Sequence, residues 1–432
     1  MANPRATDAS ALDASTTALA LADELELELE RLLETWLPRC VDELHGGFLC
    51  DFDYRWRHVG PDRKTLEFQA RMARLGAILT KAFPDEHLYR EVAEHGFRYL
   101  HDTMWDAEYG GWYRLVDRAG HPLEGYTKHM HGSSYALSAC TAYYEATSDP
   151  QALALAQQAF AWCDAHGHDE RFGGYFNMFQ RDGRLVLRGE DSPLENRERD
   201  TIGTPYGLKD ANTSSDLLEA LVDLYETWPD AKLRERLVEL FLIVRDRIVV
   251  APGAAHVILQ PDWTPVPDFG HFAQSIHTAN HLMEGSACLG LESDDRTRAV
   301  YKSVLDTVLR YGWDRKNGGI YFGGSTYGPI YTADTMLVFP QKVWWGQAEG
   351  MRGLIRLWRR FPDDERDYFA RFRELWSYVQ RHVVDARYGG WYREGMDSDP
   401  EAPTRPKASE WRDASHEVSS LLECIETLRS GA

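Results

Sequence analysis

The chain lacks the features that mark several large classes of protein. It contains no run of 18 consecutive apolar residues, and no basic segment followed by a short apolar core opens it, so neither a membrane span nor a secretory signal is expected. Its six cysteines are scattered without a CxxC pair, which is typical of buried thiols in a reducing compartment. We therefore expect a soluble, cytoplasmic protein.

Positive charge is also scarce. The sequence has 48 Lys and Arg against 68 Asp and Glu, a formal net charge of −20. Nucleic acids and anionic membrane surfaces are bound through Lys and Arg, so no nucleic-acid or membrane partner is expected. The chain has neither a Gly-rich phosphate loop nor a GxSxG sequence, which disfavours nucleotide chemistry and serine hydrolysis.

A Gly-Gly-aromatic punctuation is the main organisational signal. It recurs at residues 46–48, 110–112, 173–176, 318–321 and 389–392. Counted between second glycines, the steps are 64, 63, 145 and 71 residues. The long step spans two repeats, with the Pro-rich loop 260–265 in place of the missing punctuation. The spacing therefore predicts six repeats.

Helical periodicity fits between these marks. One amphipathic stretch precedes each mark, at about 19–37, 86–104, 150–166, 231–249, 295–311 and 365–383. A second follows, at about 64–82, 129–147, 211–227, 271–289, 341–360 and 409–429, and is rich in small residues that suit close packing inside a ring. The pattern predicts an all-α (α/α)6 toroid with short β-hairpins in the long loops on one face. An open solenoid of helical pairs is the alternative.

The sequence predicts that the toroid is a single domain. Residues 19–432 would make up this single catalytic domain, while residues 1–18, rich in Ala, Ser, Thr and Asp, are expected to be a disordered tail. The sequence does not select an oligomeric state, although a homodimer would be the commonest assembly.

Polar residues begin each second helix and should meet at one mouth of the ring. They are Arg71, His131, Asn212, His271, the run from Trp344 to Glu349, and His416. Any one of them could be a helix cap, but six equivalent positions favour a site. His271 and His416 could act as paired bases near neutral pH. Arg71 could stabilise an oxyanion, and Trp345 could stack on a sugar.

Two histidine pairs raise the question of a metal. His277 and His281 are four residues apart on one helix, and His129 lies close to His131. Such pairs can bind zinc, but no HExxH sequence or Cys/His cluster accompanies them. Histidines lining the cavity or the core are favoured, and neither a metal nor a cofactor is expected.

Several motifs carry a resemblance to a known family. They are Gln69-Ala70-Arg71, Asn212-Thr213, Leu218-Glu219-Ala220, Gly270-His271, the run from Trp344 to Glu349, Trp411 and His416. From about residue 40 onward, the sequence resembles the N-acylglucosamine 2-epimerase superfamily, which includes cellobiose 2-epimerases and mannose isomerases.

The resemblance implies a function. The implied reaction is metal-independent proton transfer between C1 and C2 of a free reducing sugar through a cis-enediolate. A mannose-type hexose is the first substrate expected. His271 and His416 would be the acid/base pair, Arg71 would stabilise the enediolate, and Glu349 would open the ring or orient the substrate. The substrate-binding residues would be Trp344, Trp345, Asn212, His131, Gln274, His277, Gln347 and Trp411.

Two departures leave the reaction open between isomerisation and 2-epimerisation. The family reads Gly-His-x-x-Glu followed by an aromatic residue, whereas this chain has Gln274 and His277. Cellobiose epimerases also carry histidines where this chain has residues 212–216. A glycoside-cleaving enzyme pairing Glu349 with Asp210 or Asp216 is one alternative. A non-catalytic sugar-binding member is the other.

Overall fold

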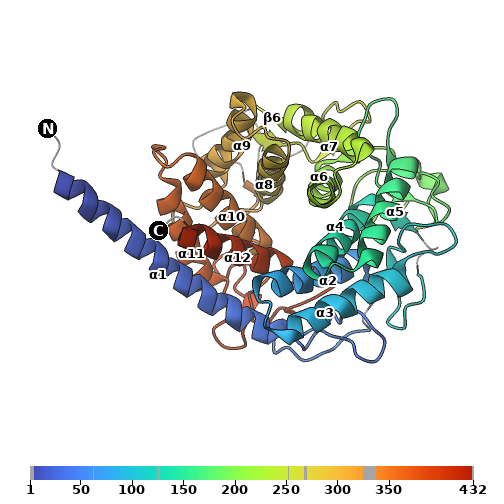
Figure 1. The fold of residues 1–432 in the computed structure, drawn as a ribbon, viewed down its shortest axis with the longest axis horizontal. Helices are drawn as coiled ribbons and strands as arrows, with labels where there is room; N and C mark the ends of the chain where they lie inside the picture. The colour runs from blue at the N-terminus through green and yellow to red at the C-terminus, as the bar shows by residue number, and fades with distance from the viewer. Residues whose placement is uncertain are drawn as a thin grey trace.

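The computed structural model describes residues 4–61, 63–123, 127–251, 253–266, 270–324 and 337–430. Figure 1 shows the helices arranged as a double ring. The inner helices are α2 (Leu66–Ala82), α4 (Met130–Thr147), α6 (Ala211–Thr227), α8 (Phe272–Cys288), α10 (Trp344–Arg360) and α12 (Ser415–Ser430). The outer helices are α1 (Pro4–Trp36), α3 (His87–Arg98), α5 (Pro150–Gly167), α7 (Ala231–Ile243), α9 (Asp295–Thr307) and α11 (Tyr368–His382). The predicted (α/α)6 toroid is confirmed.

The ring closes because each inner helix packs against the next and α12 packs against α2. Each of α3, α5, α7, α9 and α11 packs on the inner helix that precedes it in the chain. These pairs are joined by short turns in which an aspartate often caps the outer helix: Asp149 accepts from Gln151 N, and Asp230 from Lys232 N. Each helical hairpin therefore consists of an inner helix, a short turn and the outer helix that follows it.

The sixth pair is formed by the two ends of the chain, because α1 packs on α12. Arg429 of α12 donates to Glu26 of α1. Helix α1 begins at Pro4, within the segment for which the sequence predicts a disordered tail, and its N-terminal end projects from the ring (Figure 1). Among the described residues, no helix is long and apolar enough to cross a membrane.

The long connections form a layer of short antiparallel strands on one face. Strand β1 (Lys64–Thr65) pairs with β2 (Leu115–Val116), β3 (Lys128–His129) with β4 (Met178–Phe179), and β5 (Lys209–Asp210) with β8 (Ile258–Leu259). Strand β10 (Gly323–Gly324) pairs with β9 (Gly270–His271) and β11 (Leu337–Phe339), and β6 (Val249–Val250) with β7 (Ala254–Ala255). Most strands that lead into an inner helix thus pair with the following connection, which ties neighbouring repeats together.

Each Gly-Gly turn is built the same way, around an aspartate four residues before the first glycine. In the second turn, the amide of Asp106 donates to Gly111 O and the amide of Gly110 donates to Asp106 O. Both glycines have a positive φ, 68° and 70°, which L-residues adopt only at a cost. The turn then returns the chain toward the next inner helix.

A buried lysine forms an ion pair with the aspartate of each turn. The five pairs are Lys64–Asp42, Lys128–Asp106, Lys209–Asp169, Lys342–Asp314 and Lys407–Asp385, at 2.6–3.0 Å, and each lysine is at most 1% exposed. Lys209 Nζ also donates to the carbonyls of Gly173 and Pro261 at 2.7 and 2.9 Å. We call this arrangement the lysine clasp. It holds the strand before an inner helix against the preceding Gly-Gly turn.

Replacing Lys209 by Met should lower the free energy of unfolding by about 3–5 kcal/mol, because the Asp169 carboxylate would stay buried without its cation. The measurement is chemical unfolding followed by circular dichroism. Lys232→Met is the matched control, because Lys232 is 46% exposed and forms an ion pair with Glu235 at the surface. Its effect should stay within about 0.5 kcal/mol. Equal losses in the two variants would contradict a structural role for the clasp.

Candidate functional site

A cavity of about 500 Å³ opens at the face that carries the long connections. Its floor comes from the first turns of the inner helices and its walls from the connections. The lining residues are Arg71, His131, Tyr135, Thr201, Ile202, Asn212, Gln274, His277, Phe322, Phe339, Gln341, Val343, Trp344, Trp345, Arg393, Glu394, Trp411 and His416. A volume of this size, with aromatic walls and a few convergent polar groups, is typical of a small-molecule site.

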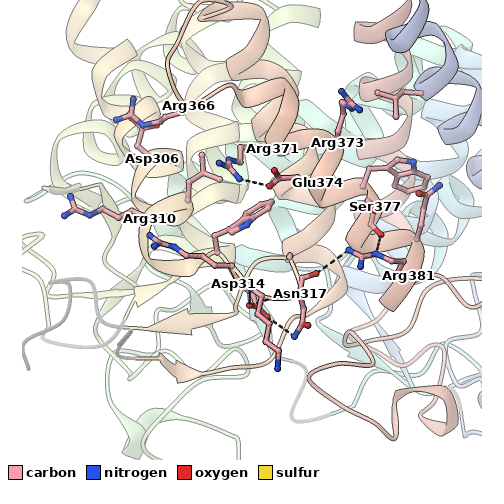
Figure 2. Close-up of a pocket in the computed structure, with 18 of the residues that line it drawn as sticks. Asp306, Arg310, Asp314, Asn317, Arg366, Arg371, Arg373, Glu374, Ser377 and Arg381 are labelled. Carbon is pink, nitrogen blue, oxygen red and sulfur yellow. Dashed lines mark hydrogen bonds and ion pairs between the residues drawn. The ribbon is translucent and has the colours of Figure 1, made fainter. Parts of the chain in front are cut away.

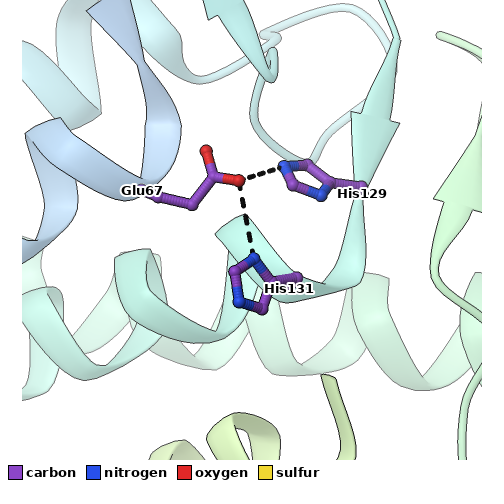
Figure 3. A group of neighbouring side chains, drawn as sticks. All are labelled: Glu67, His129 and His131. Atoms are coloured by element: carbon purple, nitrogen blue, oxygen red, sulfur yellow. Dashed lines mark ion pairs between the residues drawn. The ribbon is translucent and has the colours of Figure 1, made fainter. Parts of the chain in front are cut away.

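Carboxylates and imidazoles alternate around the ring axis, one from each inner helix. In ring order they are Glu67, His131, Asp216, His277, Glu349 and His416. The five contacts between neighbours measure 3.5, 3.0, 2.7, 3.5 and 2.9 Å. Figure 3 shows the first of these contacts, with His129 as a second neighbour of Glu67 at 3.0 Å. We call these six residues the axial chain.

The last pair of the axial chain presents a free base to the cavity. His416 Nδ1 donates to Glu349 Oε1 at 2.9 Å, while Glu349 Oε2 accepts from Asn280 Nδ2 at 2.7 Å. Burial lowers the pKa of His416 below its usual value, and the cations of Arg71 and His277 lower it further against the pull of Glu349. A neutral His416 that donates through Nδ1 carries its lone pair on Nε2. That atom has no partner among the described residues.

The middle of the axial chain carries fixed charges. Burial opposes charge at His277, but the carboxylates of Glu349 and Asp216 raise its pKa to about 10. Burial also opposes charge at Asp216, yet its contacts with His131 and His277 hold the pKa well below the ordinary value. Tyr135 donates to Asp216 Oδ2 at 2.9 Å. Both nitrogens of His277 therefore face carboxylates.

Arg71 supplies positive charge at the side of the cavity. Its guanidinium lies 4.1 Å from the centroid of the Tyr135 ring, and Nη1 lies 3.4 Å from Asp413 Oδ2. The Trp345 ring lies 5.7 Å from His416 and is tilted by 34°. Trp345 thus presents an aromatic surface beside the base, as a sugar platform requires.

Two of the residues expected in the site lie elsewhere. His271 caps α8 from strand β9, and its ring packs edge-on against Phe322 at 4.7 Å, outside the set that lines the cavity. The expected pairing of His271 with His416 is thus not the arrangement found. His277, six residues further and on the axis, has its ring 5.6 Å from that of His416.

Gln347 is the second expected site residue that lies outside the cavity. Its amide bonds the backbone N–H and C=O of Ile320, both at 2.8 Å, and the side chain is fully buried. Gln69 makes the same pair of bonds to Phe48 in the first repeat. Both glutamines therefore anchor the residue that follows a Gly-Gly turn, and neither lines the cavity.

The other expected residues lie at the cavity. Arg71, His131, Asn212, Gln274, His277, Trp344, Trp345, Trp411 and His416 line it, and Glu349 lies directly beneath in contact with His416. Sequence reasoning missed Tyr135 and Glu67 as members of the constellation, and it named Asp216 only as a carboxylate of the glycoside-cleaving alternative. The helical register could have found them, since each lies two or six residues after the residue that caps its inner helix.

The imidazole–carboxylate groups raise the question of a metal ion. Glu67, His129 and His131 bring one ligand atom each within 4.8 Å of one another. Ligands of a tetrahedral zinc at about 2.0 Å stand about 3.3 Å apart. The contacts of 2.7–3.0 Å in and beside the axial chain are shorter than this, and two of them, His277–Asp216 and His416–Glu349, are hydrogen bonds. We therefore assign these groups to ion pairs.

A larger cavity, of about 940 Å³, lies on the outer wall between α1, α9 and α11 (Figure 2). Arginines dominate it, and several bond acceptors close by, as Arg371 does to Glu374 and Arg381 to Ser377 O. None of its described lining residues is a histidine. The axial cavity, with its free imidazole, is the better candidate for proton chemistry.

Known proteins resemble this chain over most of its length. A cellobiose 2-epimerase from Bacteroides fragilis is 27% identical over 381 residues, covering 86% of this chain and 90% of that protein. A D-mannose isomerase from Marinomonas mediterranea is 22% identical over 94% of this chain and 97% of its own. The solved structure of cellobiose 2-epimerase from Spirochaeta thermophila superposes with a TM-score of 0.83 at 25% identity, covering 96% and 98% of the two chains.

The family model of N-acylglucosamine 2-epimerase (GlcNAc 2-epimerase) matches residues 46–412. This span runs from the first Gly-Gly turn to the segment before α12 and takes in five of the six inner helices. The chain belongs to the N-acylglucosamine 2-epimerase family.

Proposed function

We propose that this protein interconverts an aldose and a ketose by moving a proton between C1 and C2 of a free reducing sugar. The observation that carries the proposal is that His416 lines the cavity while its Nδ1 is held by Glu349, which leaves Nε2 as the nitrogen that can act as a base. A neutral imidazole backed by a carboxylate is a suitable general base near neutral pH. The D-mannose isomerase among the relatives supports a mannose-type hexose as the first substrate to test.

The steps follow from the positions of His416 and Arg71. With the sugar in its open-chain aldehyde form, His416 Nε2 takes the proton from C2, and the electrons of that bond form the C1=C2 double bond of an enediolate. The negative charge comes to rest on O1, where the Arg71 guanidinium stabilises it. The imidazolium of His416 then returns the proton to C1, and a proton moves from O2 to O1. The product is the ketose.

One base favours isomerisation over 2-epimerisation. A proton taken from C2 can be returned to C1 by the same imidazole on the same face, whereas inversion at C2 needs an acid on the opposite face. Gln274 carries no acidic proton, and His277 is engaged by two carboxylates. His271 lies outside the cavity lining. A 2-epimerase like the cellobiose 2-epimerase relatives would need a second proton donor from another source.

Glycoside cleavage fits these groups less well. It needs one carboxylic acid that is protonated and one carboxylate, on either side of the bond. Imidazole contacts hold the pKa values of Glu349 and Asp216 well below their ordinary values although burial opposes this. Asp210 bonds the amide and hydroxyl of Thr213 as the cap of α6. A non-catalytic sugar-binding role is the outcome if no sugar is turned over.

Incubation with mannose, fructose and other free hexoses in deuterium oxide tests the proposal. We expect conversion between aldose and ketose, with solvent deuterium entering at the carbon that receives the proton, followed by proton NMR. Conversion to the C2 epimer without any ketose would contradict the single-base mechanism. Sugar binding by calorimetry with neither exchange nor conversion would support the non-catalytic alternative.

Replacing His416 by Gln should lower kcat by about 10²–10⁴-fold, because general-base catalysis is lost, while the melting temperature changes little. His416 is 15% exposed at the cavity, so its removal leaves no buried hole. His129→Gln is the matched control, because His129 is fully buried behind Glu67; its main effect should be on stability. A large fall in melting temperature for His416→Gln would instead make His416 a core residue.

A further inference from the structure

His277 lies between two carboxylates in the middle of the axial chain. Its Nε2 is 2.7 Å from Asp216 Oδ1, and its Nδ1 is 3.5 Å from Glu349 Oε1. The side chain is only 7% exposed. An imidazole with a carboxylate at each nitrogen is stable only when both nitrogens carry hydrogen, which makes it a cation.

The same carboxylate oxygen receives both imidazoles. Glu349 Oε1 lies 2.9 Å from His416 Nδ1 and 3.5 Å from His277 Nδ1. A permanent cation at His277 therefore neutralises part of the charge that would otherwise draw a second proton onto His416. It also repels that proton directly across 5.6 Å between the two rings.

We propose that His277 is a positioning residue, a fixed positive charge that keeps His416 unprotonated and aligned by Glu349, and so sets the lower pH limit of catalysis. This inference rests on the proposed function only where it speaks of catalysis. Its electrostatic part concerns the protonation of His416 and holds whether or not the protein turns over a sugar.

Other charged groups face the two histidines and must be included. Around His416 they are Glu349 and Arg352 from α10, Arg71 from α2, and Asp413 before α12. Around His277 they are Asp216 from α6, Glu349 from α10, and His281 on α8 itself, whose Nε2 lies 3.1 Å from His277 Nε2 and whose Nδ1 contacts Glu284. Arg71 and Arg352 stay charged at every working pH, so neither produces a titration near neutrality.

The sign of the pH dependence follows. His416 accepts a proton only when it is neutral, so activity falls as the pH drops through its pKa. Burial first, then the nearby cations, lower that pKa. Removing the cation at residue 277 should raise it, and the acid limb of kcat/KM should move to higher pH. For charges about 5–6 Å apart, the expected displacement is about one to two pH units.

The experiment measures the protonation of His416 directly. The full-length protein is labelled with carbon-13 histidine, the His416 signal is assigned with the His416→Gln variant, and its titration is followed by NMR. His277→Gln should raise the titration midpoint by about one to two pH units. His277→Lys, which keeps a cation, should restore most of the original midpoint. His277→Asn is a second route, because it also removes the cation, and should move the midpoint in the same direction.

His129→Gln is the matched control, because it removes a buried imidazole at the other end of the axial chain and should leave the midpoint in place. An unchanged or lowered midpoint in His277→Gln, with a melting temperature showing that the variant is folded, would overturn the inference. If that variant does not fold, His277→Asn decides in the same way. A raised midpoint in a protein that converts no sugar would support the inference and refute the proposed function.

Discussion

The burial of five lysine ammonium groups away from solvent is the constraint on which the rest of the toroid depends. Each lysine clasp buries an ammonium beside an aspartate at the point where a long connection meets an inner helix. In four of the five, those of Lys64, Lys128, Lys209 and Lys342, the ammonium also donates to the carbonyl of the first glycine of the turn. A buried charge held by several acceptors leaves the turn and the segment before the helix very little freedom relative to each other. The first two turns of the following inner helix are thereby fixed in position, and these turns carry the residues that face the axis.

The axis carries a different constraint, because each of the six inner helices contributes a carboxylate or an imidazole to it. Each carboxylate of the axial chain has an imidazole of a neighbouring helix as a counter-charge, and Glu349 has Arg352 of its own helix as well. The charge state of one residue therefore depends on residues two helices away. Burial first, and then the cations of Arg71 and His277, lower the pKa of His416, so it stays a neutral base although an ionised carboxylate touches it.

The spacing of the Gly-Gly turns was enough to predict the toroid, since each turn needs two glycines with positive φ and each interval holds two helices. The residues of the site were harder to predict from the sequence. His271 and His277 both follow the start of the fourth inner helix, and only the exact cap residue, here His271 itself, determines that residue 277 faces the axis. The lysine clasp was also missed, because the separation of lysine and aspartate varies between 22 and 40 residues. Each lysine nevertheless lies in the segment that leads into an inner helix.

The pairing of α1 with α12 has a consequence for how the molecule is made. Every other outer helix finds its partner immediately upstream in the chain, whereas α1 and α12 are separated by all the other helices of the ring. During translation the buried apolar side chains of α1, which include Leu25, Leu29 and Leu32, have to wait for α12 before their native contact can form. Contacts between distant parts of a chain form slowly, and exposed apolar surface invites association with other chains. The interval between the synthesis of α1 and that of α12 is therefore the one in which the nascent ring is most open to association.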